Sequence, residues 1–172
     1  LKDIAGELGE VGGRAKEPES AANRLQRALK NGWVKEISTV DQAVDNTWDA
    51  LGTRLVVHDG KDMGAVVQAL SDAIKSGKLK ITEVNNLEAK TDGLPYMTPD
   101  QIHALAKTQM DANTEAGNKD QVKANSSKPM DGGFTGVMIY VQYPSGVRGE
   151  IQIIGKKALA VADIEHIPYD LG

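Results

Sequence analysis

The chain has 172 residues, enough for one domain with a sizeable hydrophobic core, and 40% of them are hydrophobic. No apolar run approaches the roughly 18 residues of a transmembrane helix, and no signal-peptide pattern opens the chain. The formal net charge of −4 argues against duplex nucleic acid as a partner, and the lack of cysteine excludes disulfides and thiolate metal sites.

The first part of the chain is predicted to be helical. Residues 17–30 have Pro18 in the first turn, acidic residues at the start, basic residues at the end and Asn31-Gly32 as a stop signal. A shorter helix is expected at 41–49. Because residue 1 is Leu and not Met, we expect the chain to be one domain excised from a longer protein.

A strand, a helix and a second strand follow. Residues 53–59 (TRLVVHD) have a β-rich centre and an Asp-Gly turn after them, which predicts a strand. Residues 63–77 repeat apolar side chains at helical spacing and end at Gly77. Residues 79–84 (LKITEV) predict the next strand.

A capped helix and a loop are expected next. Residues 98–110 begin with Thr98 as the N-cap and Pro99 at the first helical position. Residues 111–132 are polar and rich in Gly, Asn, Ser and Lys, which predicts a mobile loop.

The last part of the chain predicts a hairpin and a closing helix. Strands at 136–144 and 147–154 are joined by the turn at Pro144-Ser145-Gly146 and should pair antiparallel, before a helix at 156–167. The order of elements predicts an α+β fold with a small mixed β-sheet of four to five strands flanked by helices.

Two segments carry carboxylates in places where chemistry is common. In DALGTRLVV (49–57), Asp49 precedes a strand that Arg54 begins, an arrangement that can hold a magnesium ion and a phosphate. In EIQI (150–153), Glu150 and Gln152 share one face of a strand and the isoleucines share the other. Taken alone, the two segments also fit a surface ion pair and an ordinary half-exposed strand.

Basic residues gather around the start of the first predicted helix, where they and the hydroxyl of Ser20 suit a polyphosphate: Arg14, Lys16, Arg24 and Arg27. A solvated basic face of a helix would look the same. Phe134, the only Phe in the chain, stands between glycines in a loop, where it would either stack on a base or plug the end of the core.

Taken in order, these segments resemble the motifs of the RelA/SpoT-like alarmone synthetases. The chain shows an R-x-K-x-x-x-S helix start, D-x-x-G-x-R, a Gly-aromatic turn into a strand, E-I-Q-I, and E-H followed by an aromatic residue. The resemblance covers residues 12–170, so that residues 1–172 form a single synthetase domain. It implies a nucleotidyltransferase-like fold.

The resemblance also implies the reaction. Members of this family transfer the β,γ-pyrophosphate of ATP to the 3′-hydroxyl of a nucleotide and release AMP, which gives (p)ppGpp or (p)ppApp. By the match of motifs, Asp49 and Glu150 would hold Mg²⁺, and Glu150 would also take the proton of the attacking hydroxyl.

The remaining motif positions imply two sets of binding residues. The residues that would bind ATP and its phosphates are Arg14, Lys16, Ser20, Arg24 and Arg54. The residues that would line the acceptor site are Phe134, Gln152, His166 and Lys128. The partners implied are ATP and an acceptor nucleotide, either GDP/GTP or ADP/ATP/AMP.

The sequence departs from the family pattern mainly on the acceptor side. Phe134 replaces Tyr, Met138 stands where His is usual, Thr135-Gly136 replace Arg-Ser, and Ile154-Gly155 replace Arg-Thr. Lys128 lies two residues further from the aromatic residue than the motif has it. We therefore expect that pyrophosphate transfer is retained and that the acceptor differs from the usual guanine nucleotide.

The departures favour a particular role. We expect a toxin domain of a bacterial effector, which acts in the bacterial cytoplasm after delivery as part of a secreted protein and which an immunity protein neutralises. Three alternatives fit the same residues: a small stand-alone synthetase, a toxin that pyrophosphorylates the 3′ end of tRNA, and a nucleotide-binding module without catalysis.

Overall fold

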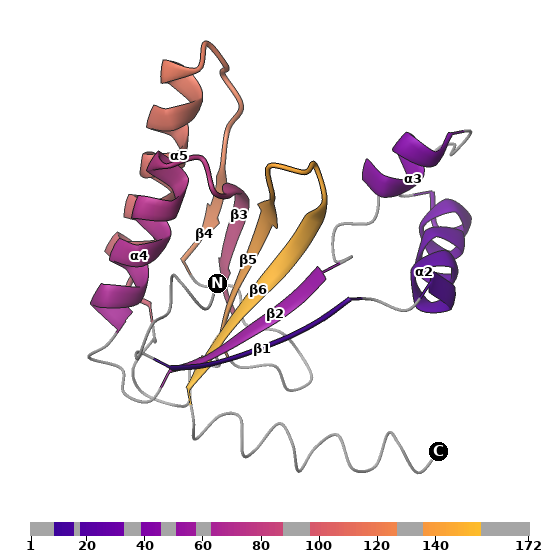
Figure 1. The fold of residues 1–172 in the computed structure, drawn as a ribbon, viewed down its shortest axis with the longest axis horizontal. Coiled ribbons are helices and arrows are strands. Elements are labelled where there is room, and N and C mark those ends of the chain that lie inside the picture. The colour runs from indigo at the N-terminus through magenta and orange to yellow at the C-terminus, as the bar shows by residue number, and fades with distance from the viewer. Residues whose placement is uncertain are drawn as a thin grey trace.

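The computed structural model describes residues 9–15, 18–32, 39–45, 51–57, 63–87, 97–126 and 136–155 (Figure 1). The helix predicted at 156–167 and the ends of the elements predicted at 41–49 and 53–59 lie outside these residues. Within them the fold is α+β, as predicted, with a mixed sheet and helices beside it.

The sheet has six strands, more than the four to five predicted. Their order across the sheet is β1-β2-β6-β5-β3-β4, in which β2–β6 and β3–β4 are parallel pairs and the other pairs are antiparallel. The strands are β1 (Gly9–Ala15), β2 (Leu51–Val57), β3 (Lys80–Asn86), β4 (Lys123–Asn125), β5 (Val137–Gln142) and β6 (Arg148–Gly155).

The strands absent from the prediction, β1 and β4, form the two edges of the sheet. The segment GEVGGRA of β1 has three glycines in seven residues, a composition that weakens a strand. It is extended because all seven residues pair with β2. The short strand β4 depends in the same way on three pairs with β3. Both strands therefore form because they pair with a neighbouring strand, and the local amino-acid composition does not predict this pairing.

The described residues form four helices beside the sheet: α2 (Pro18–Lys30), α3 (Val40–Asp45), α4 (Met63–Lys75) and α5 (Pro99–Glu115). The predicted cap of α5 is confirmed, because the Thr98 hydroxyl accepts a hydrogen bond from the Gln101 amide and the Gln101 side chain accepts one from Thr98. Figure 1 shows α2 and α3 beyond one end of β1 and β2, away from α4 and α5.

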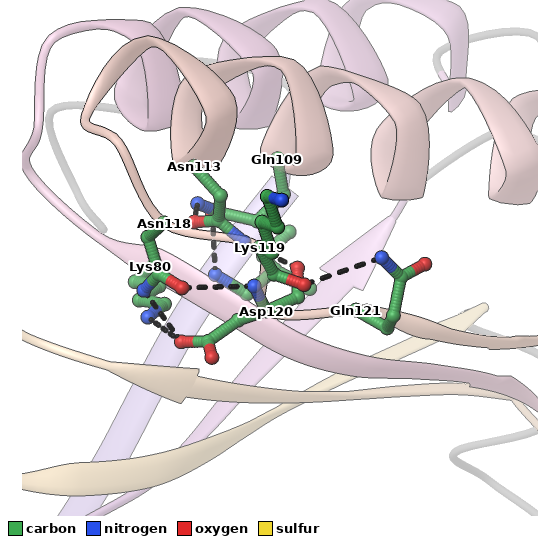
Figure 2. Close-up of polar contacts among 8 residues, drawn as sticks. Lys80, Gln109, Asn113, Asn118, Lys119, Asp120 and Gln121 are labelled. Carbon is green, nitrogen blue, oxygen red and sulfur yellow. Dashed lines mark hydrogen bonds and ion pairs between the residues drawn. The ribbon is translucent and has the colours of Figure 1, made fainter.

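The loop predicted at 111–132 is wrong in part, since α5 continues to Glu115 and β4 lies at Lys123–Asn125. One polar residue of this segment, Asn113, is buried and hydrogen-bonded, together with Gln109 one turn before it (Figure 2). Gln109 accepts from the Ile81 amide at 2.7 Å and donates to Asn113 at 2.9 Å, and Asn113 donates to the carbonyl of Asp120 at 2.9 Å. This chain of amides attaches the segment after α5 to β3.

The hydrophobic core lies between the sheet and the layer of α4 and α5. Alternate residues of β5 and β6 point into it, including Ile139, Ile151 and Ile153, each 0% exposed. The alternate residues from Met138 to Gln142 and from Arg148 to Gln152 are half-buried and lie on the opposite face, where the candidate site is found. Among the described helices, none has the length and apolarity needed to cross a bilayer.

Candidate functional site

The site begins with the alternation of side chains along β6. Because Ile151 and Ile153 are buried in the core, Glu150 and Gln152 must lie on the other face of the sheet, and both are half-buried there. This confirms the prediction that the two polar side chains share one face. The hairpin prediction is also confirmed, since β5 and β6 pair antiparallel.

The register of β2 against β6 brings a cation to this pair. Gly52 pairs with Glu150 and Arg54 pairs with Gln152, although about a hundred residues separate them in sequence. The guanidinium of Arg54 donates to Gln152 Oε1 from Nε at 3.2 Å and from Nη2 at 3.1 Å. Gln152 Nε2 donates in turn to Glu150 Oε1 at 3.0 Å. The three side chains thus form one connected line across two strands.

This line borders a cavity of about 500 Å³, a volume typical of small-molecule sites. The residues around it are Gly12, Gly13, Gly52, Thr53, Arg54, Glu150 and Gln152. A Cβ on Gly12 would meet no atom within 4 Å, so this glycine leaves the backbone of β1 open to a ligand. The glycines of β1 and Thr53 are members of the site that sequence reasoning missed, although the Gly-Gly pair beside Arg14 was a signal for close backbone approach.

The hydrogen-bonding groups of Arg54 and Glu150 that Gln152 does not use determine what the site can bind. Two N–H groups of Arg54 are used by Gln152, and the remaining three of its five can bind phosphate oxygens. Glu150 Oε1 accepts from Gln152, and no described residue donates to Oε2, which is left for a metal ion or a proton. A cation and a carboxylate on one wall suit an anionic substrate that carries a metal ion.

The other predicted site residues divide into two groups. Arg14 lies in β1, where it pairs with Gly52, and Ser20 and Arg24 lie in α2, but the structure does not describe their side chains. The rest fall outside the described residues: Lys16, Asp49, Lys128, Phe134 and His166. Within the described residues no group of three or more His, Asp or Glu side chains gathers to hold a metal.

No protein-family model matches the chain, and no curated protein sequence matches it either. Solved structures do. A GTP pyrophosphokinase family protein from Streptococcus pneumoniae superposes with a TM-score of 0.53 at 19% identity, over 98% of this chain and 64% of its own. The small alarmone synthetase 1 from Bacillus subtilis, bound to its product pppGpp, gives a TM-score of 0.54 at 17% identity, over 95% of this chain and 63% of its own.

These similarities identify the fold. The chain has the fold of the GTP pyrophosphokinases and small alarmone synthetases, and the predicted resemblance to alarmone synthetases is confirmed at that level. The chain spans a little under two thirds of the length of these two proteins.

Proposed function

We propose that the chain is a nucleotide pyrophosphokinase, which transfers the β,γ-pyrophosphate of ATP to the 3′-hydroxyl of an acceptor nucleotide. The observation that carries the proposal is the line Arg54–Gln152–Glu150 on the wall of one cavity, in a fold shared with GTP pyrophosphokinases. The B. subtilis structure holds pppGpp, which supports a nucleotide as substrate and product.

The step transfers one group and one proton. The 3′-oxygen of the acceptor attacks the β-phosphorus of ATP, the bond from that phosphorus to the α–β bridging oxygen breaks, and AMP leaves with that oxygen. Glu150 takes the proton of the 3′-hydroxyl on its carboxylate. Arg54 binds oxygens of the transferred pyrophosphate with the N–H groups that Gln152 leaves free, and so stabilises the charge that develops there.

The donor set fits a magnesium ion. Mg²⁺ is usually held by one or two carboxylates together with substrate phosphates and water, so a large cluster of acidic residues is not needed. Glu150 supplies one carboxylate at the cavity. We propose Asp49 as the second, because β2 begins two residues after it and Leu51 pairs with Gly149, beside Glu150. When bound, Mg²⁺ would neutralise phosphate charge and polarise the β-phosphorus.

The motif positions place the remaining residues in this proposal. Arg14, Lys16, Ser20 and Arg24 bind the donor, whereas Phe134, His166 and Lys128 line the acceptor side with Gln152. Met138 supports an altered acceptor, because it pairs with Gln152 and is half-buried on the same face of the sheet. An apolar side chain there removes the polar contact that a histidine would make, which favours adenine as well as guanine acceptors.

A product assay tests the proposal. Purified protein with ATP and Mg²⁺ is offered GDP, GTP, ADP, AMP and tRNA, and products are separated by chromatography. We expect AMP release with at least one acceptor, and a loss of about a thousandfold or more in Glu150→Gln, which cannot take a proton. Glu115→Gln, at the exposed end of α5, is the matched control and should retain full activity. Binding of ATP without AMP release in the presence of any acceptor would show a non-catalytic module instead.

For the biological role we propose a toxin domain that acts in the bacterial cytoplasm, where pyrophosphate transfer drains ATP, with an immunity protein as its partner. The acceptor-side departures, with Met138 among them, support this role. Induced expression in bacterial cells is expected to arrest growth, and Glu150→Gln is expected to relieve the arrest. An arrest of the same size with Glu150→Gln would count against a catalytic toxin.

A further inference from the structure

The two edges of the sheet differ in how well they are protected against a further strand. The edge strand β4 has only three residues and carries the exposed Lys123, and both features discourage pairing. The edge strand β1 has seven residues, contains no Pro or Lys, and pairs with β2 without a register shift. Among the described residues, no strand pairs with the outer side of β1 (Figure 1). An edge of this length and regularity is a template for another strand.

The centre of β1 is open to the backbone of another chain. Gly12 and Gly13 are exposed, and a Cβ built on Gly12 would meet no atom within 4 Å. A neighbouring strand can therefore approach the middle of β1 without meeting a side chain. Because a strand with three glycines gains little from side-chain packing, a second ladder of backbone hydrogen bonds would stabilise it.

The sequence of β1, GEVGGRA, is complementary to itself in one register. When two copies run antiparallel with Gly12 opposite Gly12, every residue of each strand is paired. The same register sets the Glu10 position of each copy opposite the Arg14 position of the other. Opposite charges directly across an antiparallel pair are stabilising. A shift of the register in either direction loses both the full overlap and the match of charges, so one pairing is favoured over the others.

We propose that the outer edge of β1 binds a second copy of this chain, which joins two sheets into one across a two-fold axis at Gly12. Antiparallel pairing of identical strands places this axis perpendicular to the sheet, so both copies turn the same face to the same side. The faces that carry Glu150 then lie together, and the layers of α4 and α5 lie together on the other side. Because β4 is short and charged, the assembly closes at two copies.

The joint between the two copies lies beside the cavity at Arg54, which β1 borders with Gly12 and Gly13. Gly12 pairs with Arg54, so the order across the joint is Arg54, Gly12, Gly12 of the second copy and Arg54 of the second copy. Three strand spacings separate the two arginine positions, or about 14 Å. The second copy therefore supplies the outer wall of each cavity. The inference goes beyond the proposed function, since the edge pairs whether or not ATP is turned over.

An engineered disulfide tests the register, because the chain has no cysteine of its own. Residues directly opposite in an antiparallel pair have Cα atoms about 4.5–5.5 Å apart, within the roughly 4.4–6.8 Å that a disulfide spans. Gly12→Cys should therefore form a disulfide-linked dimer under mild oxidation, seen by non-reducing electrophoresis. Gly64→Cys, exposed on α4 with open space around it, is the matched control and should remain unlinked. Linkage at the same rate in both variants, or in neither, would overturn the proposal.

Analytical ultracentrifugation tests the charge match. The wild-type protein should sediment with the mass of two chains at high micromolar concentration and dissociate on dilution. Glu10→Arg and Arg14→Glu should each raise the Kd of the dimer about tenfold or more, since like charges then stand opposite, and the double variant should restore the dimer. Glu115→Arg, a charge reversal at the exposed end of α5, should leave the Kd unchanged.

Two results would refute the joint at β1: a wild-type protein with the mass of one chain at every concentration, or a double variant that dissociates as readily as the single ones. Circular dichroism of each variant checks that its fold is kept. Because sedimentation measures mass alone, this outcome is separate from that of the product assay. A dimer without AMP release would refute only the transfer, and AMP release by a monomer would refute only the joint.

Discussion

Arg54 and Gln152 are joined by two hydrogen bonds to a single oxygen, of 3.2 Å from Nε and 3.1 Å from Nη2. This contact fixes the amide of Gln152, because the oxygen must face the cation and the nitrogen must face away from it. The nitrogen then reaches Glu150 at 3.0 Å. One neutral side chain therefore orients both Arg54 and Glu150, and the parallel register of β2 and β6 places all three.

Replacing the bridging amide should impair the site without unfolding the protein. Gln152→Leu removes the donor to Glu150 and the acceptor for Arg54, so we expect kcat/KM to fall about tenfold to a hundredfold, the worth of a hydrogen bond to a charged group. The melting temperature should change little, since Gln152 is only half-buried. Gln142→Leu, half-buried on the same face of the sheet, is the control and should keep its activity. Equal activity losses in both variants would show that the bridge has no special role.

Gly149 is required where β6 meets β2. A Cβ at this position would lie 2.6 Å from the carbonyl oxygen of Leu51, well inside van der Waals contact. Gly149→Ala should therefore lower the free energy of unfolding by about 1–3 kcal/mol, or about 2–12 °C in melting temperature, and displace Glu150 from Gly52. Thermal unfolding followed by circular dichroism measures the effect. Gly64→Ala, on α4 with open space around it, should instead stabilise by about 0.4–1 kcal/mol, and destabilisation of the same size there would contradict the steric explanation.

Gln109 should be a stability residue. Gln109→Leu leaves the buried amide of Ile81 without its acceptor and the Asn113 oxygen without its donor, which should cost about 2–5 kcal/mol. Denaturant unfolding measures this cost. The exposed Gln68 of α4 donates only to Asp72, so Gln68→Leu should stay within about 0.5 kcal/mol of the wild type. If the two substitutions have similar effects, the buried amide chain is not what holds the segment after α5.

Asp120 should give a small pH dependence of stability. Hydrogen bonds from Lys80 and Asn118, with the charge of Lys80, hold its pKa below the ordinary value of 3.8. The contribution is therefore present above about pH 4 and is lost as the pH falls through the lower folded-state pKa. We expect the wild type to melt slightly above Asp120→Asn at pH 6, with the gap closing towards pH 3 and shrinking in high salt, because the pair is exposed. A gap that widens on acidification would be inconsistent with this sign.

The sequence was sufficient to predict which face of the strand carries Glu150 and Gln152, but not which residues of other strands lie beside them. Alternation in EIQI placed Glu150 and Gln152 opposite the isoleucines, since a strand with one buried face has only one such arrangement. The pairing of Gln152 with Arg54 could not be predicted, because the register between strands about a hundred residues apart depends on the whole sheet. A polar composition also misled at Asn113, whose side chain is buried yet hydrogen-bonded.

The central position of β6 also sets the order of events during synthesis. Without β6, no hydrogen bonds would connect the pair β1–β2 to the group β5–β3–β4. The strand that joins these two halves of the sheet is therefore also the strand that carries Glu150. In the parallel pair of β6 and β2, Arg54 and Gln152 are 98 residues apart in sequence. Contacts between residues so far apart in sequence form late in folding. A ribosome-bound chain that has not yet released β6 therefore carries Arg54 but has no site in which that side chain can act.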